Sequence, residues 1–272
     1  ASSARGRSVG ARRPRGLACS TARCAGRARD AGVPTPQSGA RWEGRLPTLL
    51  RPLARASNRW AMERGFTSLL LEVFSREHGR LGLVARGARA AKSRWRGLLQ
   101  GFRPLLLSWS QRGELGTLTG AEARTATGMP AGRHLMSAWY LNELLMRLLT
   151  RYDPHPRLFE AYEQALRDLG AAEQPTLRIF EKHLLQELGY GLLLDQEVES
   201  GRPVMADALY EYRLESGPVP ADARLDRGVF LRGSSLLALH EERLADEAAC
   251  QEVKRLMRAV LALYLGPRPL RT

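Results

Sequence analysis

The whole sequence has few cysteines and no long apolar run. Its first 60 positions also contain almost no acidic residues. Its three cysteines, Cys19, Cys24 and Cys250, are too few and too scattered for a disulfide framework or a four-cysteine zinc site. No apolar run approaches the ~18 residues of a membrane-spanning helix. The N-terminal residues also lack the apolar segment that a secretory signal requires. These absences exclude the disulfide-rich secreted class. They predict a protein of a reducing, cytoplasmic compartment that does not bind a membrane.

The first 60 residues carry most of the net charge. They hold 13 arginines, no lysine and two acids, Asp30 and Glu43, a net charge of +11 out of the chain's +14. The rest of the chain holds 29 of the 42 basic and 26 of the 28 acidic residues. We expect residues 1–60 to be a disordered Arg-rich extension, because a segment without hydrophobic periodicity cannot offset its ordering entropy. Three explanations fit this segment: a start or reading-frame error in a GC-rich gene, a tail that attracts phosphates, or a transit peptide.

Residues 61–127 have the pattern of a small β domain. The segments "TSLLLEVFS" (67–75) and "RLGLVARGAR" (80–89) flank the turn "REHG", and "PLLLSWS" (104–110) and "LGTLTGAEA" (115–123) flank "QRGE". These runs are rich in apolar and β-favouring residues, and the second alternates, which indicates strands with one buried face. Four or five short strands within about 65 residues predict a small closed or half-open barrel of the OB-fold type.

A cationic segment joins the two predicted hairpins. Residues 85–104, "ARGARAAKSRWRGLLQGFRP", contain no acid, and Trp95 and Phe102 lie among the cations. Cations on a loop of such a domain follow a phosphate backbone, and an aromatic ring can stack on a base. Phe102 leads directly into a strand and is expected in the core. The predicted nucleic-acid-binding residues are Arg80, Arg86, Arg89, Lys92, Arg94, Trp95, Arg96 and Arg103. The alternative is a solvated basic loop in which Trp95 belongs to the core.

Residues 128–272 have the periodicity of helices. The predicted helices lie at 134–151, 157–170, 176–191, 234–245 and 246–266. Residues 195–230 interrupt them with Pro, Gly and the alternating run "ALYEYRLE" (208–215), which predicts an irregular insert with a small hairpin. The predicted fold class is α+β: an N-terminal OB-fold followed by a mainly helical domain with a small irregular β insert. Arg178 and Lys182 are four residues apart and are expected on one outer helix face.

The sequence contains no motif of an enzyme that we recognise. His183 and Glu187 are four residues apart on a predicted helix, but one such pair is not a metal site. The segment "GARAAKS" (87–93) resembles a phosphate loop, yet Ala91 stands where that motif requires glycine. We therefore predict a protein that is not an enzyme and uses no metal, cofactor or small-molecule substrate. The alternatives are an RNA-binding OB-fold protein acting in translation and a hydrolase with an unrecognised site.

Several blocks together resemble the bacterial recombination mediator family RecO. They are, in chain order, "TSLLLEVFSREHGRLGLVARGAR", "LLQGFRPLLL", "GELGTLTGAEA", "YLNELLMRLL", "LRIFEKHLLQELGYG" and "YLGPRPL". The resemblance runs from about Thr67 to Leu270, roughly three quarters of the chain. It implies an OB-fold followed by a helical domain, in agreement with the pattern of the residues.

The resemblance also implies a function and partners. A member of this family binds single- and double-stranded DNA, anneals strands and works with the partner protein RecR at the nucleoid. It also contacts the acidic C-terminal tail of single-strand-binding protein (SSB) and helps RecA load onto SSB-coated gaps. Arg178 falls on the family's arginine for the tail, and we expect Lys182 to join it.

Two departures from the family pattern lead to further expectations. Family members usually open with a strand before the "TSLLLEVF" run, whereas this chain has "RPLARASNRWAMERGF" (51–66) there, without that pattern, so the sequence leaves open whether the first strand is present. A missing strand would leave an open sheet edge. Some members carry a four-cysteine zinc site after the "LGY" helix, but residues 192–230 contain no cysteine, so no zinc is expected.

Overall fold

A computed structural model gives the fold of much of the chain. It describes residues 41–42, 47–52, 67–111, 113–124, 130–221, 228–268 and 270, with the backbone alone at 41–42 and 47–52. All of these belong to one compact unit, Ser38–Thr272. The predicted extension at 1–60 lies outside the described residues, apart from two strands at 41–42 and 47–52.

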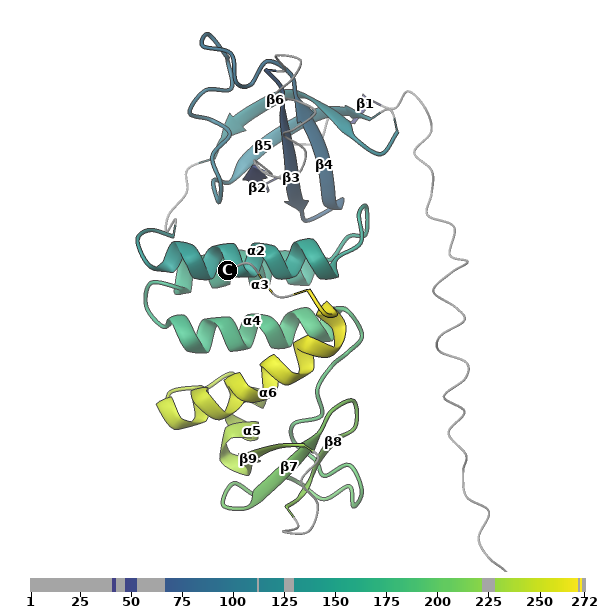
Figure 1. The fold of residues 1–272 in the computed structure, drawn as a ribbon, viewed down its shortest axis with the longest axis vertical. Helices are drawn as coiled ribbons and strands as arrows, with labels where there is room; N and C mark the ends of the chain where they lie inside the picture. The colour runs from purple at the N-terminus through teal and green to yellow at the C-terminus, as the bar shows by residue number, and fades with distance from the viewer. Residues whose placement is uncertain are drawn as a thin grey trace, which may run out of the picture. The chain divides into compact units, whose positions relative to one another are not determined.

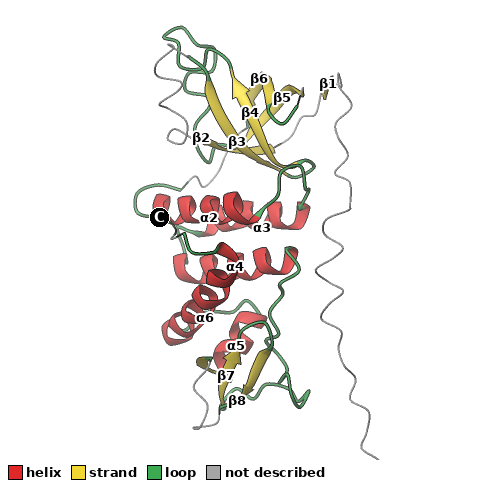
Figure 2. Ribbon diagram, turned by 45° about the vertical axis from the view of Figure 1, so that its right-hand side comes forward, coloured by secondary structure: helices red, strands yellow, loops and turns green. Residues whose placement is uncertain are grey.

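The N-terminal part of the described chain forms a six-stranded sheet (Figures 1 and 2). Its strands are β1 (Arg41–Trp42), β2 (Pro47–Pro52), β3 (Leu69–Ser75), β4 (Gly79–Ala85), β5 (Leu105–Gln111) and β6 (Gly116–Ala123). The pairings run from β5 through β2, β3, β4 and β6 and return to β5, and the β4–β6 pair is parallel. This strand order, with a short β1 added on β5, is the predicted OB-fold arrangement.

Apolar side chains of the curled sheet form a core of their own. The strands supply buried leucines such as Leu71, Leu83 and Leu107, all at most 1% exposed. Their neighbours along each strand lie on the other face, because successive side chains of a strand point to opposite sides. The alternation seen in the sequence therefore predicted which residues hold this domain together.

The first strand of this domain, whose presence the sequence left open, is formed by β2. β2 (Pro47–Pro52) precedes the "TSLLLEVF" run and pairs antiparallel with β3 along five residues, from Thr48 opposite Ser75 to Pro52 opposite Leu71. The segment was missed because its pattern, "PTLLRP", starts and ends with proline and lies ahead of the position at which the family strand was sought. Backbone pairing with β3, which needs no side-chain signature, forms the strand.

The helical domain contains α2 (His134–Leu148), α3 (Pro156–Asp168), α4 (Glu173–Glu187), α5 (Gly233–His240) and α6 (Glu247–Leu265). Helix α4 lies between α2 and α6, as Figure 1 shows and the contacts confirm. The five predicted helices are confirmed within a few residues at each end. Asp246 is the N-cap of α6, because its carboxylate accepts a hydrogen bond from the Ala249 backbone N–H at 2.9 Å.

The predicted insert is a small three-stranded sheet. Strand β7 (Leu209–Arg213) pairs with β8 (Gly217–Pro220) in the expected hairpin, and β9 (Val229–Arg232) adds to the other edge of β7. Tyr210 and Tyr212 of β7 are at most 2% exposed and belong to the large core of the helical domain. The insert is therefore held by apolar packing against the helices.

The OB-fold domain contacts the helical domain through the β3–β4 hairpin. The Tyr152 backbone N–H donates to the Arg80 carbonyl at 3.0 Å, which extends β4 onto the loop between α2 and α3. Gly79, at the turn, has φ +62°, and a Cβ built there would lie 2.0 Å from the Asp153 carbonyl oxygen. Only glycine fits this close approach of two backbones. The hairpin turn is thus fixed by its contact with the helical domain.

Two phenylalanines of the OB-fold domain complete the contact between the domains. Phe74 of β3 packs against the rings of Phe159 and Tyr162, with centroids 5.5 and 6.2 Å away. Phe102, just before β5, meets the ring of Trp139 on α2 edge to face at 5.0 Å and is 4% exposed. Both belong to the core of the helical domain. The prediction that Phe102 is a core residue is confirmed.

In the part of the chain that the structure describes, no helix is long and apolar enough to cross a bilayer.

Candidate functional site

The loop between β4 and β5 carries an exposed group of cations. Five side chains of this loop are exposed: Arg86, Arg89, Lys92, Arg94 and Arg96. None of them, nor half-buried Arg103, forms an ion pair with a carboxylate of the described residues. Unpaired exposed cations on one loop form a local positive potential that attracts a polyanion. The six cations among the eight predicted residues that lie on this loop are therefore available to a polyanion beside the sheet.

The loop is ordered by its own hydrogen bonds. The Arg89 backbone N–H donates to the Thr67 carbonyl at 2.8 Å, which ties the start of the loop to the chain two residues before β3. Near its end, the Arg103 guanidinium donates to the Gly97 carbonyl at 2.8 Å. Phe102 is buried in the helical domain directly beside Arg103. The cations therefore stand on a loop that is anchored at both ends, which lowers the entropic cost of binding.

Trp95 is placed differently from the prediction that it stacks on a base. It is 6% exposed, packs in the core of the OB-fold domain and donates its indole N–H to the Arg86 carbonyl at 3.3 Å. The Arg94 guanidinium covers its ring at 4.2 Å and donates to the Thr119 carbonyl at 3.1 Å. The core packs against this ring and Arg94 covers it, so the ring has no free face on which a base could stack. The alternative reading, a core tryptophan under a basic loop, is the arrangement that the structure has.

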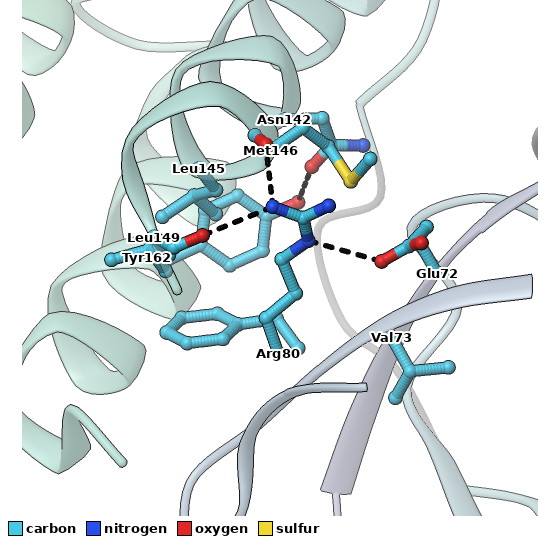
Figure 3. A pocket seen from close by; sticks show the side chains of 9 residues that line it. Glu72, Val73, Arg80, Asn142, Leu145, Met146, Leu149 and Tyr162 are labelled. Atoms are coloured by element: carbon cyan, nitrogen blue, oxygen red, sulfur yellow. Dashed lines mark hydrogen bonds and ion pairs between the residues drawn. The ribbon is translucent and has the colours of Figure 1, made fainter. Parts of the chain in front are cut away.

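Arg80 does not lie with the loop cations. Its Nε donates to the Glu72 carboxylate at 3.0 Å, and its Nη1 donates to the carbonyls of Met146 at 2.6 Å and Leu149 at 3.0 Å (Figure 3). These carbonyls end α2, where a cation is stabilised by the helix dipole. Arg151 also donates to Glu72. Arg80 therefore joins the two domains, and its placement among nucleic-acid-binding residues is corrected.

Arg124 is a cation that the sequence reading missed. It is exposed, follows the last residue of β6, and its backbone N–H donates to the Pro104 carbonyl at 3.1 Å. That bond places the Arg124 backbone beside the end of the cationic loop, next to Arg103. The register of the β5–β6 hairpin, Leu105 opposite Ala123, is the signal that predicts this neighbour.

A pocket of about 850 Å³, including its open mouth, lies where α2, α4 and α6 meet. Three of its lining residues are cationic, Arg178 on α4 and Lys254 and Arg258 on α6. The apolar part of the wall includes Met136, which is 59% exposed. The other lining residues are Ser137, Tyr140, Gln174, Leu177 and Leu270. The combination of three cations with apolar side chains suits an anionic ligand that also has an apolar group.

A buried ion pair joins the pocket wall to the helical core behind it. Arg178 is 4% exposed, and its Nη1 lies 3.0 Å from Oε2 of Glu181, which is fully buried. The Tyr140 hydroxyl donates to Oε1 of the same carboxylate at 2.5 Å. Burial raises the pKa of the Glu181 carboxyl, and the neighbouring Arg178 opposes that rise. Burial, together with the Glu181 charge, also raises the pKa of Tyr140, so its hydroxyl keeps its proton and remains a donor.

The expectation that Arg178 and Lys182 share an outer face is wrong. Arg178 is buried at the pocket, whereas the Lys182 ammonium donates to the Leu239 and His240 carbonyls at the end of α5, at 3.2 and 2.9 Å. It also pairs with Glu242 at 2.7 Å. Residues four apart on a helix diverge by about 40°, and here that difference separates an interior position from a contact with the next helix.

Lys254 and Arg258 are pocket residues that the sequence reading missed. Their spacing of four predicts a shared face on α6, but only the packing of α6 against α4 brings that face to Arg178. The same packing gives His183 a partner, since its Nε2 lies 3.1 Å from Glu242. Among the described residues, no group of three His, Cys, Asp or Glu side chains is placed to hold a metal ion.

Comparison with known proteins identifies the family. Residues 41–126 match the family model "Recombination protein O N terminal", and residues 130–272 match "Recombination protein O C terminal". The chain is 48% identical to the DNA repair protein RecO of Nitrosococcus oceani over 208 residues, which cover 76% of this chain and 85% of the relative. It is 47% identical to the protein of the same name from Alkalilimnicola ehrlichii over 218 residues, 78% of this chain and 87% of the relative. With both domains matched, the chain belongs to the RecO family of DNA repair and recombination proteins.

Proposed function

We propose that this chain is a recombination mediator that acts by binding and catalyses no reaction. It binds single- and double-stranded DNA through the cationic loop of the OB-fold domain and anneals complementary strands. It docks the acidic C-terminal tail of SSB in the pocket between α2, α4 and α6. Together with RecR it helps RecA load onto SSB-coated gaps, in the bacterial cytoplasm at the nucleoid. Family membership supports this function, since the relatives are named DNA repair proteins.

The observation that carries the DNA-binding part is the loop of exposed cations without carboxylate partners. A bound cation displaces counterions from the phosphates, and this release favours binding in low salt. Annealing follows if the same surface neutralises two strands, because their mutual repulsion then falls. Binding by this loop is expected to be independent of base sequence, since its tryptophan is buried and cannot stack on a base.

The pocket supports the tail-docking part. Its cations attract the aspartates of an acidic tail, and its apolar wall accepts an aromatic residue at the tail's end. A guanidinium can hold a carboxylate by two parallel hydrogen bonds, which adds geometric selection to the charge. Because the pocket belongs to the helical domain and the loop to the OB-fold domain, the tail and the DNA bind at separate places.

The change Arg178→Ala tests the two-site proposal. We expect it to weaken binding of a fluorescein-labelled peptide of aspartates ending in phenylalanine by about tenfold or more, the loss typical of a charge-assisted hydrogen bond. Binding of labelled single-stranded DNA should stay within about twofold. Fluorescence anisotropy measures both. Lys182→Ala is the matched control, since that cation on the same helix lies outside the pocket. Equal loss of peptide and DNA binding in Arg178→Ala would contradict separate sites.

A further inference from the structure

A buried carboxylate, that of Glu181, contacts Arg178 and Tyr140 of the pocket wall, which is unexpected at a site for an acidic ligand. Glu181 is fully buried one turn along α4 from Arg178, and its charge has the same sign as the proposed ligand. A negative charge near the pocket weakens the binding of an anion. Its presence there therefore suggests a second role. Its contacts indicate that role.

Glu181 engages one end of the Arg178 guanidinium. Its Oε2 pairs with Nη1 at 3.0 Å, while the Tyr140 hydroxyl fixes Oε1. The buried Nε of Arg178 has no hydrogen-bond partner among the described residues. In a guanidinium, Nε and Nη2 form the edge that holds a carboxylate side-on. Because Glu181 pairs with Nη1, it leaves the Nε and Nη2 edge of Arg178 for another acceptor.

We propose that Glu181 is a positioning residue of this pocket, which holds Nη1 of Arg178 and thereby presents its Nε and Nη2 edge to a carboxylate of the acidic tail. The inference rests on the proposed docking of the tail. A buried arginine without this anchor would adopt several rotamers, and ordering them on binding lowers affinity. The carboxylate is tolerated because the cations around it outnumber it.

The charged and titratable groups that face Glu181 come from three helices. They are Tyr140 on α2, Arg178 on α4, and Lys254 and Arg258 on α6. Burial raises the pKa of the Glu181 carboxyl above its usual value, although the cations oppose this rise. Glu181 is therefore protonated at a higher pH than an exposed glutamate. Protonation removes its charge and weakens its ion pair with Arg178.

The test measures binding of the peptide of aspartates ending in phenylalanine to the full chain carrying Glu181→Gln. Glutamine keeps the size of the side chain and an acceptor for Tyr140, but loses the charge that holds Arg178. We expect the affinity to fall about tenfold at neutral pH. In the Arg178→Ala background, Glu181→Gln should change the affinity by less than about twofold, because Glu181 acts through Arg178. A role confined to stability would give the same loss in both backgrounds.

A pH series adds a second readout. As pH falls through the raised pKa of Glu181, the difference between wild type and Glu181→Gln should shrink, since protonation converts wild type into a neutral side chain as well. Tyr140→Phe provides a milder variant, which removes only the bond to Oε1 and should weaken the peptide about threefold. It replaces Glu181→Gln if that chain does not fold.

Opposite outcomes separate this inference from the proposed function. If Arg178→Ala loses the peptide while Glu181→Gln binds it as well as or better than wild type, Glu181 is a repelling charge and the positioning role is refuted, with the tail site intact. If Arg178→Ala binds the peptide normally, the tail site and the positioning role are both refuted. A parallel loss of DNA binding in Glu181→Gln would also refute positioning, because it would mark general damage.

Discussion

Removing charge from the cationic loop should change the salt dependence of DNA binding more than any other property. The triple variant Arg86→Gln, Arg89→Gln and Lys92→Gln takes away three exposed cations that form no ion pair with the described residues. Arg94 and Arg96 are left in place because their guanidinium groups also hydrogen-bond loop and strand carbonyls. Glutamine keeps most of each side chain, so the loop's packing should survive.

The magnitude follows from counterion release. Each phosphate neutralised on single-stranded DNA contributes about 0.7 to the slope of log affinity against log salt. Three cations therefore account for a slope of about 2. Between about 50 and about 200 mM salt, that slope corresponds to a factor of about 20 in affinity. Wild type should lose about 20-fold more affinity over this range than the triple variant.

Anisotropy of a labelled oligothymidine at four or five salt concentrations measures this slope. The matched control replaces three exposed arginines of the helical domain, Arg157, Arg202 and Arg243, by glutamine. Both variants lower the net charge equally, so a difference between them reports position. An unchanged slope in the loop variant, or the same reduction in the control, would refute the reasoning that the loop binds phosphates.

Two changes at the domain contact should alter stability and leave the salt slope unchanged. Arg80→Gln removes the cation that Glu72 and the end of α2 share, and should lower the free energy of unfolding by about 3 kcal/mol in a urea titration; a reduced salt slope would show that Arg80 binds DNA after all. Gly79→Ala combines a positive φ with a Cβ 2.0 Å from the Asp153 carbonyl oxygen, and should cost about 2–5 kcal/mol. Gly87→Ala, with φ +68° and nothing within 4 Å of the added Cβ, should cost only about 1–2 kcal/mol, and equal losses in the two glycine variants would contradict a tight hairpin contact.

Local patterns were sufficient for most secondary structure. The helices at 134–148 and 247–265 and the β3–β4 and β5–β6 hairpins follow from periodicities that depend only on neighbours along the chain. The strand at Pro47–Pro52 was missed, since its flanking prolines hide it and only its pairing with β3 makes it a strand. Pairing partners far apart in sequence leave no local signature.

Individual side chains of the candidate sites were harder to predict, for a related reason. The loop cations were found because charge without counter-charge is visible in one short segment. Trp95 and Arg80 were misassigned because the same residue type serves a core or a domain contact once its neighbours are known. For Arg178 the family resemblance, rather than any pattern, pointed to a binding role.

The sequence by itself determined the fold class, the placement of most helices and strands, and the cationic loop, because each depends on residues close together along the chain. The tertiary structure decided which arginines remain in solvent. It buried Arg178 against Glu181, turned Arg80 onto the end of α2, and brought Lys254 and Arg258 to α4. A charge acts on whatever lies within a few ångströms of it, and in a folded chain those neighbours come mostly from other elements.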